Sequence, residues 1–244
     1  MKKTVLITGA TSGIGLGCAR KFAANGDRLI LTGRNEQRLE EIRKELTAKG
    51  TEVLTLVFDV RDREKATECI NNLPAEWKDI DVLVNNAGLA LGLEPEYEGS
   101  YDDWDTMVDT NIKGLLTMTR LVVPGMVKRD RGHIINIGSV AGDAAYANGN
   151  VYCATKAAVK TITDGLRLDV ANTAIDEDGI AKEHSLRRTE VVVPCIMYGE
   201  ILDVPESLAS ELEKAMGFVK RIGQNRNRGL GRCTMSVIKE GGEQ

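Results

Sequence analysis

The chain has 244 residues, of which 42% are hydrophobic and 28% charged, and its formal net charge is −4. This length suits one α/β domain with or without a small addition, and the composition supplies enough apolar residues for a buried core. The acidic balance argues against attraction of the whole surface to nucleic acid or to an anionic membrane, although a local basic patch is compatible with it.

The cysteines and the N-terminal segment together predict a cytoplasmic protein. Five cysteines are spread along the chain without a CxxC pair: Cys18, Cys69, Cys153, Cys195 and Cys233. This arrangement is typical of reduced thiols and not of a disulfide framework or a zinc site, so we expect no metal. The apolar run after Lys3 ends at a glycine-rich turn and is too short for a signal peptide or a membrane span.

Short apolar runs alternate with amphipathic stretches along most of the chain. The runs predict strands at residues 4–8, 28–33, 52–60, 80–88 and 132–139. The stretches between them predict a helix ending near Gly26 and further helices at 36–50, 62–73, 101–128 and 151–171. This alternation predicts a parallel sheet covered on both faces, which is a Rossmann-like, doubly wound α/β fold.

The segment TGATSGIG directly follows the first predicted strand and opens a helix. Gly9, Gly13 and Gly15 allow a tight turn and a close approach of the backbone to a pyrophosphate, which N–H groups at the helix start would bind. Glycines can also simply end a strand, but the strand–turn–helix context favours a dinucleotide site. Ser12 and Ile14 belong to the same loop.

The end of the second predicted strand indicates which dinucleotide would bind. An NAD site usually has an acid about 20 residues after the glycines for the ribose 2′-hydroxyl, whereas the strand here runs into Gly33 and Arg34 without a carboxylate. A guanidinium at Arg34, with Arg38 one helical turn away, suits a 2′-phosphate and favours NADP. The alternative is that Arg34 is a solvated loop arginine.

Two further strand ends supply predicted cofactor contacts. Asp59, beside Val60 at the end of the third strand, is placed to accept a hydrogen bond from the adenine amino group, and its alternative role is to cap the following helix. The segment NNAG ends the fourth strand, where open α/β sheets bind their ligands, and it contributes Asn86, Ala87 and Gly88.

Four side chains predict acid–base chemistry when they are taken together. Tyr152 and Lys156 share one helical face, and a neighbouring ammonium group with an oxidised nicotinamide favours the phenolate form of a tyrosine. Ser139 can hydrogen-bond a substrate oxygen, and Asn111 can hold a water that links Lys156 to solvent. Each of these residues alone has a structural alternative, but their order on these elements favours the catalytic interpretation.

These motifs together resemble the short-chain dehydrogenase/reductase family over about residues 1–175. The segments DTNIKGL, PGMVKRDRGHIINIGSVAG and GNVYCATKA further resemble the NADP-dependent 3-hydroxy acid dehydrogenases, which oxidise serine, allo-threonine and similar acids. The resemblance implies hydride transfer between the nicotinamide and the hydroxyl-bearing carbon of the substrate. It also implies a dimer or tetramer formed through the helix that carries Tyr152 and the neighbouring helix.

The resemblance implies a role for each of the four side chains. Tyr152 would be the acid–base, Ser139 would orient the substrate, and Asn111 would complete a proton relay. Lys156 would favour the phenolate of Tyr152 and hold the ribose.

The family pattern stops near Asn172. The family continues with a sixth strand, a Pro-Gly turn, a substrate-covering helix and a seventh strand, but the segment TAIDEDGIAKEHSLRR is acidic and rich in turn formers. We therefore expect an NADP-binding core at residues 1–173 that lacks its usual last strands and leaves a hydrophobic edge on the fifth strand. An atypical segment at 174–244 follows, with a strand–helix–strand pattern.

This C-terminal segment carries a basic, glycine-rich loop. Seven basic residues and no acid occur from Lys214 to Lys239, and the loop IGQNRNRGLGR resembles that of the RAMP superfamily of CRISPR RNA-binding subunits. The resemblance implies part of a ferredoxin-like fold and RNA binding, and the structural alternative is a solvated turn. Two alternatives to a dehydrogenase therefore remain. One is an RNA-binding module with an N-terminal dehydrogenase segment, and the other is a chimera with impaired dehydrogenase activity.

Overall fold

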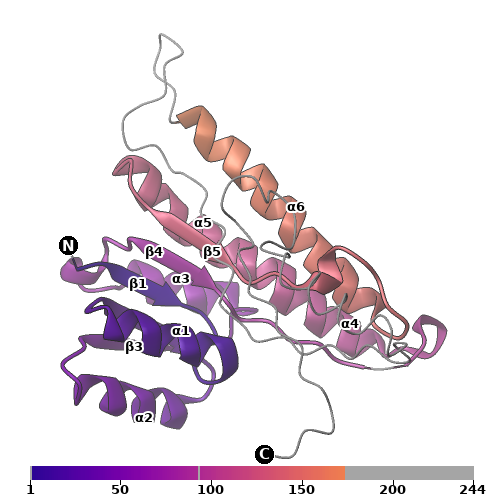
Figure 1. The fold of residues 1–244 in the computed structure, drawn as a ribbon, viewed down its shortest axis with the longest axis horizontal. Helices are drawn as coiled ribbons and strands as arrows, with labels where there is room; N and C mark the ends of the chain where they lie inside the picture. The colour runs from indigo at the N-terminus through magenta and orange to yellow at the C-terminus, as the bar shows by residue number, and fades with distance from the viewer. Residues whose placement is uncertain (1, 93, 174–244) are drawn as a thin grey trace, which may run out of the picture. The chain divides into compact units, whose positions relative to one another are not determined.

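The computed structural model describes residues 2–92 and 94–173 (Figure 1). The strand–helix–strand pattern predicted for 174–244, its basic loop and the domain boundary predicted after residue 173 lie outside the described residues, as do Cys195 and Cys233.

A sheet of five parallel strands forms the centre of the fold, in the order β3-β2-β1-β4-β5. The strands are β1 Thr4–Ile7, β2 Arg28–Gly33, β3 Val53–Val57, β4 Val82–Asn85 and β5 His133–Asn136. Because β2 and β3 lie on one side of β1 and β4 and β5 on the other, the strand order reverses between β1 and β4. Ile7 is level with Leu31 and with Val84, so the loops after these three strands leave the sheet at one edge. The predicted doubly wound fold is confirmed.

Helices cover both faces of this sheet (Figure 1). The described helices are α1 Gly13–Ala24, α2 Glu36–Thr47, α3 Arg63–Asn71, α4 Tyr101–Val108, α5 Leu115–Lys128 and α6 Asn150–Thr173, with short turns η1 Ala75–Trp77, η2 Glu96–Glu98, η3 Asp109–Gly114 and η4 Val140–Gly142. No helix in this described part is long and apolar enough to span a bilayer.

The strand side chains alternate between two hydrophobic clusters. Leu6 of β1 packs with residues of α3 and α5 on one face, whereas Val5 and Ile7 pack with residues of α1 and α2 on the other. All four residues of β1 are buried, as expected for a parallel strand covered on both sides. The two clusters hold the loops after β1 and β4 on a rigid base.

The described sheet ends at β5. His133 is opposite Val82 and Asn136 is opposite Asn85, so β5 pairs with β4 along its length. Its residues are only half-buried, and among residues 2–92 and 94–173 no strand pairs with its outer edge.

The helix predicted at 101–128 is divided by a π turn. α4 ends at Val108, the wider turn η3 follows, and α5 begins at Leu115. A Cβ atom on Gly114 would lie 2.7 Å from Cγ2 of Val60, so η3 passes close to the chain that leaves β3. π turns of this kind occur often at functional sites, and this one contains Asn111.

Candidate active site

An open cleft of about 520 Å³ lies where the strands end. It is lined by the loops that follow the strands and by the start of α6. Most of the residues predicted from the sequence line it: Gly9, Ser12, Gly13, Ile14, Arg34, Asp59, Val60, Asn86, Ala87, Gly88, Ser139, Tyr152 and Lys156. Gly15, Arg38 and Asn111 are outside this lining.

The glycine loop has the geometry of a phosphate-binding turn. Gly9 and Gly13 have φ angles of +63° and +52°, which favour glycine. A Cβ atom on Gly15 would lie 2.3 Å from the carbonyl oxygen of Gly9 and 2.4 Å from Nδ2 of Asn86, so only a glycine lets α1 start this close to the loop. The absence of a side chain at Gly15 therefore shapes the cleft although Gly15 does not line it.

The N-terminus of α1 has no side-chain cap, because Ser12 makes no capping hydrogen bond. In contrast, Asn35, Asp62 and Ser100 cap α2, α3 and α4 with their side chains. The first N–H groups of α1 thus remain for an anion in the cleft. Together with the glycine geometry, this open helix end fits the pyrophosphate of a dinucleotide.

A hydrogen-bonded junction joins the loop after β1 to the loop after β4. Thr8 Oγ1 accepts from the backbone N–H groups of Asn86 and Ala87, both at 3.0 Å. Asn86 Nδ2 donates to the carbonyl oxygens of Thr8 (2.9 Å) and Gly9 (3.0 Å). Thr8 was not among the residues predicted for the site. Its position directly before the glycine loop could have indicated a role in the site, but nothing in the sequence indicated that it binds Asn86 and Ala87.

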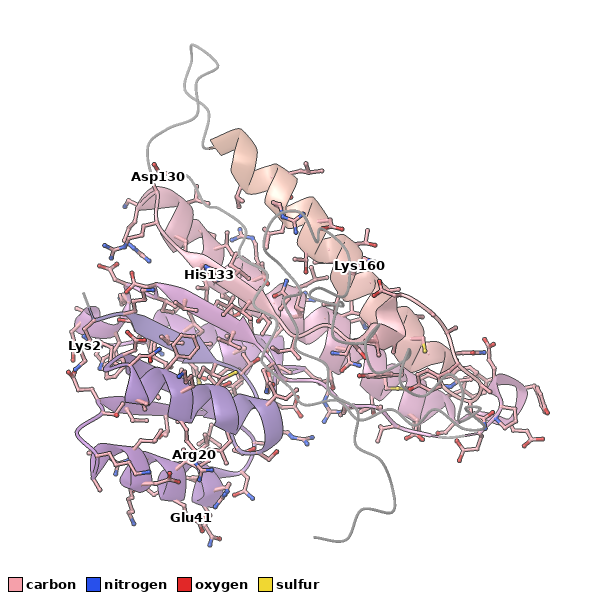
Figure 2. The ribbon with its side chains drawn as sticks, viewed as in Figure 1. Lys2, Arg20, Glu41, Asp130, His133 and Lys160 are labelled. Atoms are coloured by element: carbon pink, nitrogen blue, oxygen red, sulfur yellow. The ribbon has the colours of Figure 1, made fainter. Side chains whose placement is uncertain are left out.

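At the other end of the cleft, the side chain of Arg34 is largely exposed (66%), and its Nη1 lies 3.7 Å from Asp59 Oδ2. Arg38, in contrast, donates from Nη1 to Glu41 (2.8 Å) and from Nε to the carbonyl oxygen of Thr11 (3.4 Å); Figure 2 labels Glu41 on the outer side of α2. Arg34 is therefore the better placed of the two predicted arginines to meet a phosphate in the cleft.

Asp59 is held by the arginine two residues after it. It accepts from the backbone N–H of Arg61 (2.9 Å) and from its guanidinium group (2.8 Å). Burial works to raise the pKa of Asp59, but the hydrogen bonds from Arg61 outweigh it, so the pKa lies below its ordinary value. The alternative role as a helix cap is wrong, because Asp62 caps α3.

Tyr152 and Lys156 enter the cleft from the first turns of α6. Lys156 is 8% exposed, its Nζ donates to the carbonyl oxygen of Ile137 at 2.9 Å, and it lies 5.8 Å from the centroid of the Tyr152 ring. Burial lowers the pKa of Lys156 below its ordinary value. Ser139 lines the same cleft, and its Oγ accepts from the N–H of Ala141 at 3.2 Å, so it also caps η4.

Asn111 is buried behind these residues. Its Oδ1 accepts from the N–H of Leu89 (2.9 Å), and its Nδ2 donates to the carbonyl oxygen of Leu89 (2.8 Å) and to Thr155 Oγ1 (3.0 Å). A Cβ atom on Gly88 would lie 3.2 Å from Asn111 Oδ1 and 3.6 Å from Lys156 Nζ, so both groups face the same glycine. Thr155 was not predicted as a site residue.

Other reactive side chains lie away from the cleft. Cys153 is buried, and His133 begins β5, where burial and then Lys3 hold its pKa below the ordinary value. Within the described part of the chain, His, Cys, Asp and Glu form no group of three or more that could hold a metal ion.

Comparison with known proteins places this architecture in a family. The family model for short chain dehydrogenases matches residues 3–182. The NADP-dependent 3-hydroxy acid dehydrogenase YdfG of Salmonella typhi is 57% identical over 171 residues, which are 70% of this chain and 68% of the relative. The relative of the same name from Escherichia coli K12 is 53% identical over 171 residues, with the same coverage of both chains.

Solved structures give the same result. The crystal structure of serine dehydrogenase from Escherichia coli superposes with a TM-score of 0.66 at 53% identity, over 70% of this chain and 78% of that one. The closed form of serine dehydrogenase complexed with NADP+ gives the same TM-score and identity, over 70% of this chain and 68% of that one. Since the family model covers far more than half of the sequence, the chain belongs to the short-chain dehydrogenase family.

Proposed function

We propose that this protein is an NADP-dependent oxidoreductase that transfers hydride between the nicotinamide and the hydroxyl-bearing carbon of a small 3-hydroxy acid such as serine or allo-threonine. The observation that carries the proposal is the shared cleft, which brings Tyr152 and Lys156 together with the glycine loop and Arg34. The relatives named for 3-hydroxy acids and for serine support the substrate class.

The cofactor contacts follow from the fit of the cleft. Gly9, Gly13 and the open N-terminus of α1 would hold the pyrophosphate. Arg34 would hold the 2′-phosphate, because its guanidinium group lines the cleft and is mostly exposed. Lys156 would hold the nicotinamide ribose. The remaining predicted contacts are Ser12, Ile14, Gly15, Arg38, Asp59, Val60, Asn86, Ala87, Gly88 and Tyr152.

The protein supplies the proton chemistry. When bound, the nicotinamide accepts or donates the hydride. Tyr152 takes the proton from the substrate hydroxyl at its phenolic oxygen, and Ser139 donates a hydrogen bond to the same substrate oxygen. The ammonium group of Lys156 lies 5.8 Å from the centroid of the Tyr152 ring, so its positive charge attracts negative charge that develops on the phenolic oxygen during the reaction.

Asn111 takes part in the proton relay through its carbonyl group. Oδ1 accepts one hydrogen bond from Leu89, and an amide oxygen has a second lone pair that can accept from a water. Such a water would link Lys156 to solvent, since Asn111 Oδ1 and Lys156 Nζ both face Gly88.

A titration with NADPH, followed by a rate assay with L-serine and allo-threonine, tests this proposal. We expect NADPH fluorescence to show saturable binding, and Arg34→Ala to weaken NADPH by about tenfold while NADH changes little. Tyr152→Phe should lower kcat by at least about 100-fold and leave NADPH binding unchanged. A parent protein that binds no NADPH would refute the proposal.

We further propose a cytoplasmic protein that forms a dimer or tetramer. The spread of thiols without a CxxC pair supports a reducing compartment, and the resemblance to the family supports the assembly. Light scattering after gel filtration measures the mass directly, and a monomer at micromolar concentration would contradict the assembly.

A further inference from the structure

Thr155 lies between Tyr152 and Lys156 on α6 but faces away from the cleft. It is 1% exposed and does not line the cleft. Its Oγ1 donates to the carbonyl oxygen of Tyr152 at 2.7 Å, which commits its only hydrogen. The lone pairs of Oγ1 then face outward from the helix, and one of them accepts the hydrogen bond from Asn111 Nδ2 at 3.0 Å.

This hydroxyl completes a chain of hydrogen bonds across three elements. Leu89, in the loop after β4, is bound through both its N–H and its carbonyl group to Asn111 of η3. Asn111 continues to Thr155, and Thr155 to the backbone of Tyr152. This series of hydrogen bonds therefore joins a loop that lines the cofactor cleft to the helix that carries the proposed acid–base.

We infer that Thr155 is a positioning residue: its hydroxyl fixes α6 against η3 and so sets where Tyr152 and Lys156 stand in the cleft. This inference rests on the proposed function. Without the hydroxyl, an N–H of Asn111, itself 2% exposed, would be buried without its acceptor. The helix and the π turn then separate or admit water, and either change moves Lys156 relative to Gly88.

The same helix provides a matched control. Thr163 Oγ1 donates to the carbonyl oxygen of Val159 at 2.7 Å and accepts from Asn136 Nδ2 at 2.8 Å. Its hydrogen bonds are thus of the same two kinds as those of Thr155, but it lies two turns further along α6 and does not line the cleft. If the role of Thr155 were purely structural, Thr155→Val would, like Thr163→Val, lower thermal stability without changing NADPH binding or kcat.

The experiment compares Thr155→Val, Thr155→Ser and Thr163→Val in the full chain by thermal unfolding, NADPH titration and steady-state kinetics with L-serine. We expect both valine variants to lose thermal stability, and Thr155→Val to lose more because Thr155 is buried and Thr163 is half-buried. Only Thr155→Val should raise the dissociation constant of NADPH, by about tenfold, and lower kcat by a similar factor with little change in the KM for L-serine. Thr155→Ser, which keeps the hydroxyl, should stay within about twofold of the parent.

The outcomes separate this inference from the proposed function. If Thr155→Val matches Thr163→Val in both NADPH affinity and kcat, Thr155 has no positioning role, and the proposed function stands. If Thr155→Ser is as impaired as Thr155→Val, the hydroxyl is not the cause and the inference is wrong. If the parent itself binds no NADPH, the proposed function fails and this inference with it.

Discussion

Replacing Gly15 by alanine tests whether the close approach of α1 to the loop after β1 builds the cofactor site. The added Cβ would lie 2.3 Å from the carbonyl oxygen of Gly9 and 2.4 Å from Asn86 Nδ2. Both distances are far below van der Waals contact, and one of the atoms belongs to the backbone. The helix start and the glycine loop must therefore move apart.

The magnitude follows from three contributions. Overpacking costs about 1–3 kcal/mol, and displacing Asn86 weakens its two hydrogen bonds to Thr8 and Gly9, at about 1 kcal/mol each. Replacing a helical glycine by alanine returns up to about 1 kcal/mol. The net loss is about 2–4 kcal/mol, which corresponds to a fall in Tm of roughly 4–8 °C, because 1 kcal/mol shifts the Tm of a chain of this size by about 2 °C.

Gly17→Ala is the control, because Gly17 lies on the same helix and a Cβ there would meet nothing within 4 Å. We expect it to raise Tm slightly and to leave NADPH binding unchanged. Differential scanning fluorimetry gives Tm, and NADPH fluorescence gives the dissociation constant, which should rise at least about tenfold in Gly15→Ala. A Gly15→Ala protein that melts and binds like Gly17→Ala would refute the steric argument.

Three other changes have defined outcomes. Burial and Lys3 lower the pKa of His133 in the folded state, so below about pH 6.5 the unfolded chain binds more protons than the folded one and the protein should lose stability as pH falls. The Tm measured from pH 7.5 to 5.0 should therefore fall less in His133→Gln than in the parent. The same dependence of Tm on pH in both proteins would contradict this. Asn85→Ala removes a buried amide that donates to Thr119 and Asn136, and it should lower the free energy of unfolding in urea by about 2–4 kcal/mol. Asn72 is exposed, so Asn72→Ala should lower it by less than about 0.5 kcal/mol. Similar losses in both variants would argue against the buried network. Asp59→Asn should leave the start of α3 intact, because Asp62 is its cap, so a loss of helical circular dichroism comparable to that of Asp62→Ala would show that the cap was misassigned.

The sheet was predictable because its strands are continuous apolar runs. β2 occupies the predicted residues 28–33, whereas β4 ends at Asn85 and not at residue 88. The reason is local: the N–H groups of Asn86 and Ala87 bind Thr8 Oγ1 and leave the strand ladder. Apolar patterning shows where a strand is buried but not where its backbone changes partners.

The π turn shows a second limit of sequence patterns. The apolar periodicity across 101–128 predicts one helix, and a single wider turn changes that periodicity too little to be seen. The position of Asn111 depends on this turn, and its partners Leu89 and Thr155 come from distant parts of the sequence. The site residues thus stay a prediction from their sequence motifs, whereas the hydrogen bonds that hold them required the structure.

The junction between Thr8 and Asn86 bears on how the protein is made. Its partners are separated by 78 positions, and β4 must be inserted beside β1 before they can meet. Contacts of such long sequence separation form late, because the entropy of closing the intervening loop opposes them. During synthesis, the glycine loop leaves the ribosome early but stays without its support until β4 has emerged. An N-terminal fragment that ends before β4 should therefore contain the whole glycine motif and still bind no dinucleotide.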